Sequence, residues 1–295
     1  MNRRTFGQLI TAASMGQVFP RLSAQTQAAI ATRGFRFSVM LWALEKQAPF
    51  DRCLEMVAAA GYEGVELTGE FRSWSAIEIR RVMARMRSLG LQVDLISGVK
   101  SGFGDPSGTN DFLSELNAQI RMANDLESPR INLKSGPRIG KLSPADQHAA
   151  CVDNLKRAAS LAATNNIELL IEPIDPIENP TMYMTSVSEA FAIVRDVESP
   201  RIRVLFDFYH EQRAGGNLIE KLEQNFDLVG LVHIADVPGR HQPGTGEIDY
   251  LNIYKKLAEL RYDKFIAMEF YPTGDVVEVL RQARLDALQA QASYL

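Results

Sequence analysis

Hydrophobic positions follow two alternating spacings from residue 35 onward. Short, nearly continuous apolar runs rich in Val, Ile, Leu and Phe are typical of parallel strands buried on both faces. Longer stretches between them place apolar residues three and four apart, the spacing of an amphipathic helix. The pattern predicts strands at 35–42, 64–68, 91–97, 130–134, 167–174, 202–208, 229–235 and 265–270, and helices at 50–60, 75–89, 111–126, 144–164, 187–197, 218–226, 251–260 and 276–290.

Local signals agree with these boundaries. Ser143 followed by Pro144 is typical of a helix start, and Gly61 and Gly90 stand where helices should end. Strict alternation of eight strands and eight helices predicts an α/β fold, a single (β/α)8 TIM barrel over residues 35–295. The rival, an open doubly wound sheet, would carry a glycine-rich turn after its first strand, and the segment that follows Trp42 has no glycine.

Composition restricts the partners. The 295 residues are 46% hydrophobic and 23% charged, with a formal net charge of −4 and no basic tract, so nucleic acid is disfavoured as a partner. No apolar run is long enough to span a bilayer. The two cysteines, Cys53 and Cys151, are far apart in the sequence and are interpreted as small buried residues rather than a disulfide.

The first residues resemble an export signal. Arg3 and Arg4 precede Phe6 and a weakly apolar stretch, residues 9–19, as in twin-arginine signals. Small residues provide cleavage sites after Ala24 or Ala31. We therefore expect residues 1–31 to be a signal segment, the mature protein to be exported or periplasmic, and no membrane to be bound after cleavage; a cytoplasmic protein is the alternative.

Acidic and imidazole side chains stand at or near the ends of four successive predicted strands: Glu172, Asp207, His233 and Glu269. A buried carboxylate without a partner is costly, so it must be paired, protonated or bound to a metal. If the barrel closes, inward-pointing side chains from these strands converge. Three carboxylates and one imidazole favour Mn²⁺, Mg²⁺ or Co²⁺ over a structural Zn²⁺. The alternative is a purely structural polar core.

A family resemblance supports the metal interpretation. The segment His233-Ile-Ala-Asp-Val-Pro-Gly-Arg-His-Gln-Pro-Gly-Thr-Gly-Glu-Ile-Asp-Tyr250 resembles the hydroxypyruvate isomerase group of the xylose isomerase-like barrels. Phe37-Ser-Val-Met-Leu-Trp42 and Ala60-Gly-Tyr-Glu-Gly-Val-Glu66 also resemble that family, and the resemblance runs from residue 35 to the end.

The resemblance implies both a reaction and a set of roles. It implies a metal-dependent aldose–ketose isomerase that acts through a cis-enediolate on a small hydroxy-carbonyl compound or sugar. The metal ligands are then Glu172, Asp207, His233 and Glu269, and the acid/base pair is Glu172 and Glu269. The substrate-binding residues are His210, Arg240 and, by a weaker match, Glu178.

Departures from the family pattern keep alternatives open. Hydroxypyruvate isomerases often carry an amide where His233 stands, so a ketose 3-epimerase or an exported 3-keto-sugar lyase or binding relative is the alternative. Lys134 stands where small neutral residues are usual; it either meets an anionic substrate or pairs with a neighbouring acid. Glu178 is otherwise an exposed loop acid, and Trp42 is either an apolar pocket wall or barrel-mouth packing. Apurinic endonucleases share the barrel, but this acidic chain has only four histidines for a zinc cluster. A homo-oligomer is possible, because the apolar face of the predicted helix 276–290 suits either the barrel or a partner.

Overall fold

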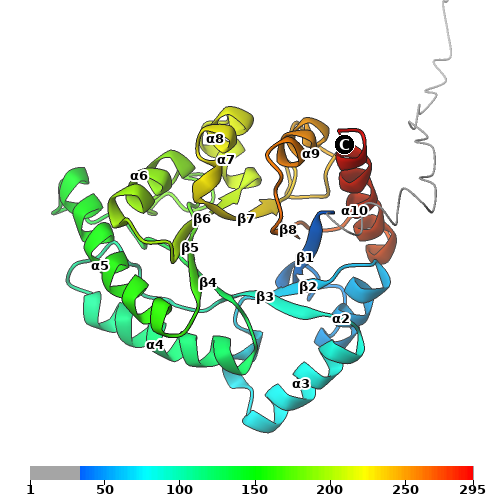
Figure 1. Ribbon diagram of the computed structural model, residues 1–295, viewed down its shortest axis with the longest axis horizontal. Helices are drawn as coiled ribbons and strands as arrows, with labels where there is room; N and C mark the ends of the chain where they lie inside the picture. Colours follow the sequence, from blue (N-terminus) through cyan, green and yellow to red (C-terminus); the bar gives the residue numbers. More distant parts are fainter. Residues whose placement is uncertain (1–33, 295) are drawn as a thin grey trace, which may run out of the picture.

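The computed structural model describes residues 34–294, so the expected export segment lies outside the described residues. Parallel strands form one closed barrel in sequence order, and β8 pairs with β1 to close it (Figure 1). The predicted TIM barrel is therefore confirmed. The strands are β1 (Arg36–Met40), β2 (Gly64–Leu67), β3 (Gln92–Ser97), β4 (Arg130–Leu133), β5 (Glu168–Ile171), β6 (Ile202–Asp207), β7 (Val229–Ile234) and β8 (Phe265–Met268).

Helices surround the barrel (Figure 1). Within residues 34–294, each helix is too short or too polar to cross a membrane. The last helix packs against α9 and α2, and its buried apolar side chains belong to the main hydrophobic core. The α-helices are α2 (Phe50–Ala59), α3 (Ala76–Ser88), α4 (Thr109–Asp125), α5 (Pro144–Thr164), α6 (Val187–Val197), α7 (Phe208–Ala214), α8 (Leu218–Gln224), α9 (Tyr250–Glu259) and α10 (Val276–Ala292).

Most predicted boundaries hold to within two or three residues, and their local causes are visible. The hydroxyl of Ser143 accepts a hydrogen bond from the amide of Asp146 and caps α5. Gly61 and Gly90 follow α2 and α3 with φ of 86° and 72°, a conformation that costs glycine little. Cys53 and Cys151 are buried and free, as predicted.

One helix was not predicted. The sequence pattern extends the sixth strand to residue 208 and places the next helix at 218–226, whereas the structure has two short helices, α7 and α8, after β6. The Asp207 carboxylate accepts hydrogen bonds from the amides of Tyr209 (2.7 Å) and His210 (3.3 Å), so it ends the strand and caps α7. His210 therefore lies in the first turn of a helix, not at a strand end.

Strand alternation decides which side chains point inward. Leu170, Leu205 and Leu231 belong to a small cluster inside the barrel, whereas their neighbours belong to the larger core between strands and helices. Two residues after each of these leucines, the side chain that points inward is Glu172, Asp207 or His233, respectively. The barrel interior thus has an apolar layer, followed by acidic and imidazole side chains at the carboxyl ends of the strands.

Candidate active site

A cavity of about 450 Å³ opens at the carboxyl ends of the strands. Its volume lies within the range of small-molecule sites, roughly 300–1,000 Å³. Six of the eight residues predicted for the site line it: Lys134, Glu172, Glu178, His210, Arg240 and Glu269. The other two, Asp207 and His233, are buried and contact Arg240 and Glu269 respectively.

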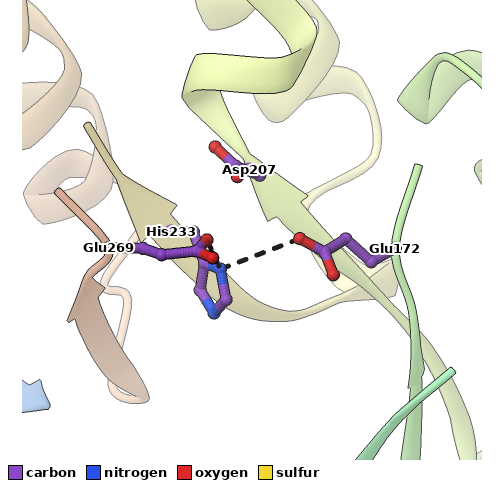
Figure 2. Close-up of side chains that lie close together, drawn as sticks. All are labelled: Glu172, Asp207, His233 and Glu269. Atoms are coloured by element: carbon purple, nitrogen blue, oxygen red, sulfur yellow. Dashed lines mark hydrogen bonds and ion pairs between the residues drawn. The ribbon is translucent and has the colours of Figure 1, made fainter. Parts of the chain in front are cut away.

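The structure brings the four expected metal ligands together. Glu172, Asp207, His233 and Glu269 are buried, and each offers a ligand atom within 4.8 Å of the others. Figure 2 shows Glu172 and Glu269 extending toward one another from opposite sides, with His233 beside Glu269. His233 Nδ1 lies 2.7 Å from Glu269 Oε2 and 3.9 Å from Glu172 Oε1. Ligands on opposite sides of Mg²⁺ are about 4 Å apart, so the donor set fits one divalent ion.

Two cations lie beside this cluster. Arg240 Nη2 lies 2.8 Å from Glu269 Oε2 and 3.4 Å from Asp207 Oδ2. Lys134 Nζ lies 3.5 Å from Glu172 Oε2. Lys and Arg side chains are long enough to reach the centre of the barrel mouth from adjacent loops, which strand spacing does not reveal. Part of the acidic charge is therefore balanced by the protein itself.

These cations determine the protonation of the two central carboxylates. Burial would raise the pKa of Glu172, but the positive charge of Lys134, together with that of His233 and His210, holds the pKa below its usual value. Burial likewise opposes ionisation of Glu269, but Arg240 and His233 hold its pKa well below the usual value. Both groups are consequently ionised at neutral pH, as a ligand or a general base requires.

Each of these carboxylates also accepts a hydrogen bond from a neutral donor. Asn132 Nδ2 donates to Glu172 Oε2 at 2.5 Å, and the Trp42 indole N–H donates to Glu269 Oε1 at 3.2 Å. Trp42 is therefore more than the apolar wall or packing residue expected from the sequence. Each acid is thus oriented by one neutral donor and one cation. Asn132 and Lys134 contact Glu172, and Trp42 and Arg240 contact Glu269.

Asp175 organises the opposite side of the pocket, and sequence reasoning missed it. Its buried carboxylate lies 2.7 Å from His210 Nδ1 and 3.1 Å from Arg213 Nη1. It also accepts hydrogen bonds from the amides of Ile177 and Glu178, both at 2.9 Å, and so shapes the loop that carries Glu178. The available signal was Asp followed by Pro176, which is typical of a turn.

Glu178 fits both interpretations from the sequence, an exposed loop acid and a residue of the site. Its side chain is 41% exposed, as a loop acid should be, yet it lines the cavity and lies 3.1 Å from Arg240 Nη1. The guanidinium of Arg240 contacts three carboxylates and lies over the rings of Trp42 (5.4 Å) and Tyr209 (4.8 Å).

A buried aspartate, Asp236, fixes the loop that presents Arg240. Its carboxylate accepts hydrogen bonds from the amides of Gly244, Gly246 and Ile248. A Cβ at Gly246 would lie 2.0 Å from the carbonyl oxygen of Val237, so only glycine fits there. The loop after β7 is thus a compact structure built around one acid.

Glu66 is a second residue that sequence reasoning did not place in the site. It lies on β2, is fully buried, and Oε2 is 3.0 Å from His233 Nε2. Burial raises the pKa of Glu66 to about 7, against the opposing effect of His233. A carboxylate within the apolar run Gly64–Leu67 was the signal available.

Comparisons with known proteins agree with this architecture. The family model described as xylose isomerase-like TIM barrel matches residues 54–290. Hydroxypyruvate isomerase of Escherichia coli K12 is 30% identical over 80% of this chain and 93% of its own length. The 2-oxo-tetronate isomerase of Cupriavidus necator is 28% identical over 80% and 93%. The D-psicose 3-epimerase of Clostridium cellulolyticum H10 shares the fold, with a TM-score of 0.70, 16% identity and coverage of 88% and 98%. By the family match and the similarity to these relatives, the chain belongs to the xylose isomerase-like TIM barrel family.

Proposed function

We propose that this protein is a metal-dependent isomerase that interconverts an aldose-type and a ketose-type hydroxy-carbonyl compound through a cis-enediolate. The relatives similar to it are named for hydroxypyruvate and 2-oxo-tetronate, so small hydroxy-carbonyl acids are the first substrates to consider. One observation carries the proposal: two carboxylates, Glu172 and Glu269, extend toward one another across the cavity and share a ligand cluster with His233 and Asp207.

The chemical difficulty is the weak acidity of a C–H bond next to a carbonyl. In the proposed reaction either Glu172 or Glu269 removes that proton, the same carboxylate or its partner returns a proton to the neighbouring carbon, and the hydroxyl proton passes to the former carbonyl oxygen. Both carboxylates are held in place by fixed donors, so little reorganisation precedes proton transfer.

The cluster Glu172, Asp207, His233 and Glu269 would hold a divalent ion, Mn²⁺, Mg²⁺ or Co²⁺ by donor type. Such an ion, when bound, supplies Lewis-acid stabilisation of negative charge on the substrate oxygens. His210 and Arg240 would bind and orient those oxygens from the other side of the cavity, with Glu178 and Lys134 at its rim.

A ketose 3-epimerase is the second candidate. The same pair of carboxylates on opposite sides of a substrate suits removal of a proton from one face of a carbon and its return to the other face. His233 favours this candidate, because the isomerases that the chain resembles often carry an amide at that position. An exported 3-keto-sugar lyase or binding protein is a third possibility that retains the metal site.

Proton exchange with solvent tests these candidates. The purified protein with Mn²⁺ is incubated in D₂O with hydroxypyruvate, a 2-oxo-tetronate, a neutral ketohexose or a 3-keto sugar, and the products are followed by NMR. An isomerase yields the structural isomer labelled at the neighbouring carbon, whereas an epimerase inverts and labels one carbon. Elimination or binding without exchange would contradict both.

A matched pair of variants ties the exchange to the site. Glu269→Gln should lower the exchange rate by roughly 100-fold or more, the usual contribution of a positioned acid/base group. Glu168→Gln, at the opposite end of β5, is the control and should retain exchange, because its carboxylate pairs with Arg130 far from the cavity. Full activity in Glu269→Gln would rule out the assignment.

A further inference from the structure

Glu66 is a buried acid that the proposed reaction does not use. It is 0% exposed, and neither carboxylate oxygen has a hydrogen-bond partner among residues 34–294. Its ion-pair contact is with His233, whose Nε2 lies 3.0 Å from Oε2, at an angle outside that of a regular hydrogen bond. A carboxylate buried without aligned donors is costly, so its presence calls for an explanation.

Asp94, on the neighbouring strand β3, shows the usual solution for a buried acid in this barrel. It accepts a hydrogen bond from Ser38 at 3.1 Å and pairs with Arg130. The hydrogen bond and the ion pair of Asp94 thus go to Ser38 and Arg130 rather than to a ligand residue. The contrast indicates that Glu66 stands where it does for His233 rather than for the barrel core.

The two nitrogens of His233 face different partners. Nδ1 faces the ligand cluster, 2.7 Å from Glu269 and 3.9 Å from Glu172, and Nε2 faces Glu66. A histidine that binds a metal through one nitrogen must carry its proton on the other, and a carboxylate beside that other nitrogen fixes the tautomer and the ring orientation. Glu66 is the carboxylate in that position.

We propose that Glu66 is a positioning residue for the metal site: its carboxylate, 3.0 Å from Nε2 of His233, favours the tautomer with the proton on Nε2, so that the Nδ1 lone pair points at the ion held with Glu172, Asp207 and Glu269. This inference rests on the proposed function, because it takes the cluster to be a metal site. Glu66 itself contacts neither the ion nor the substrate.

Mn²⁺ affinity of the full chain, measured by isothermal titration calorimetry, tests the proposal without any substrate. Loss of a carboxylate behind a metal-bound histidine lowers metal affinity by about 10- to 100-fold, which is the weakening expected for Glu66→Ala. The matched control is Asp94→Asn, which replaces a buried acid on the adjacent strand. This variant should bind Mn²⁺ like the wild type even if it melts at a lower temperature.

Two conservative variants separate orientation from charge. Glu66→Gln keeps an acceptor oxygen at the same reach without the charge, and Glu66→Asp keeps the charge but withdraws the oxygens by one methylene. If Glu66 acts by orienting the ring of His233, Glu66→Gln should bind Mn²⁺ more tightly than Glu66→Asp. This comparison remains decisive if Glu66→Ala fails to fold.

Three outcomes would overturn the inference: wild-type affinity in Glu66→Ala, equal weakening in the Gln and Ala variants, or tighter binding by Glu66→Asp than by Glu66→Gln. Failure of the wild type to bind Mn²⁺ is a different result, because it would overturn the proposed metal site itself and the role of Glu66 with it.

Discussion

Asp175 holds His210 by a 2.7 Å contact between its Oδ2 and the ring Nδ1, and the other ring nitrogen lies 3.4 Å from Asp207 Oδ2. Both residues are buried, and Asp207 and Asp175 raise the pKa of His210 against the effect of burial. His210 is thereby fixed with Nε2 toward the centre of the site, and in the protonated form that these two acids favour, Nε2 would donate a hydrogen bond to a substrate oxygen.

Asp175→Asn tests this relationship. The amide retains the shape of the side chain but removes the charge that orients His210. A hydrogen bond to a charged group contributes about 1.5–3 kcal/mol, so kcat should fall by about 10- to 100-fold. Steady-state kinetics and the melting temperature are measured together. Unchanged kcat with a lowered melting temperature would show that Asp175 only stabilises the loop.

Trp42→Phe removes the indole N–H that reaches Glu269 while keeping an aromatic ring against Tyr271 and Arg240. Glu269 Oε1 then loses this hydrogen-bond donor. We expect kcat to fall by about tenfold, the low end of the effect of a hydrogen bond to a charged group. The comparison with Trp42→Ala separates the donor from the ring. If Trp42→Phe were fully active and only Trp42→Ala impaired, the indole N–H would have no role.

Lys134→Met distinguishes the two interpretations of the lysine. Its side chain is 43% exposed at the cavity rim, and the charge of Glu172 raises its pKa. If Lys134 binds a substrate carboxylate, KM for acidic substrates should rise by about 10- to 100-fold, with KM for neutral ketoses unchanged. A change in kcat for both substrate classes, with KM constant, would show that the lysine acts only on Glu172.

Export remains a prediction from the sequence. Replacement of Arg3 and Arg4 by Lys should retain the protein in the cytoplasm, whereas the wild type should be found in the periplasm of a bacterium with a twin-arginine system. Cell fractionation with immunoblotting checks this. Cytoplasmic wild type, or equal export of the double variant, would contradict it.

The barrel was predictable because two periodicities repeat along the chain, and local caps such as Ser143 mark the boundaries. The four clustered side chains were predictable because the strand ends of a closed barrel converge. A buried acid at the end of such a strand must therefore lie at the mouth of the barrel. Helix α7 was not predictable, because its seven residues are too few for a period and its start depends on the Asp207 carboxylate.

The supporting residues were harder to predict for a different reason. Asp175 and Glu66 act on His210 and His233 through contacts between residues 35 and 167 positions apart, and spacing along one strand says nothing about such pairs. The cations Arg240 and Lys134 reach the cluster through long side chains from loops, whose course is set by tertiary packing rather than by pattern.

The central claim is that Glu172, Asp207, His233 and Glu269 hold one divalent ion together. Crystals grown with Mn²⁺ and measured at the manganese absorption edge test it directly. The account predicts one anomalous peak at about 2.0–2.2 Å from an atom of each of the four residues. No peak there in crystals saturated with Mn²⁺, or a peak that touches fewer than three of them, would contradict it.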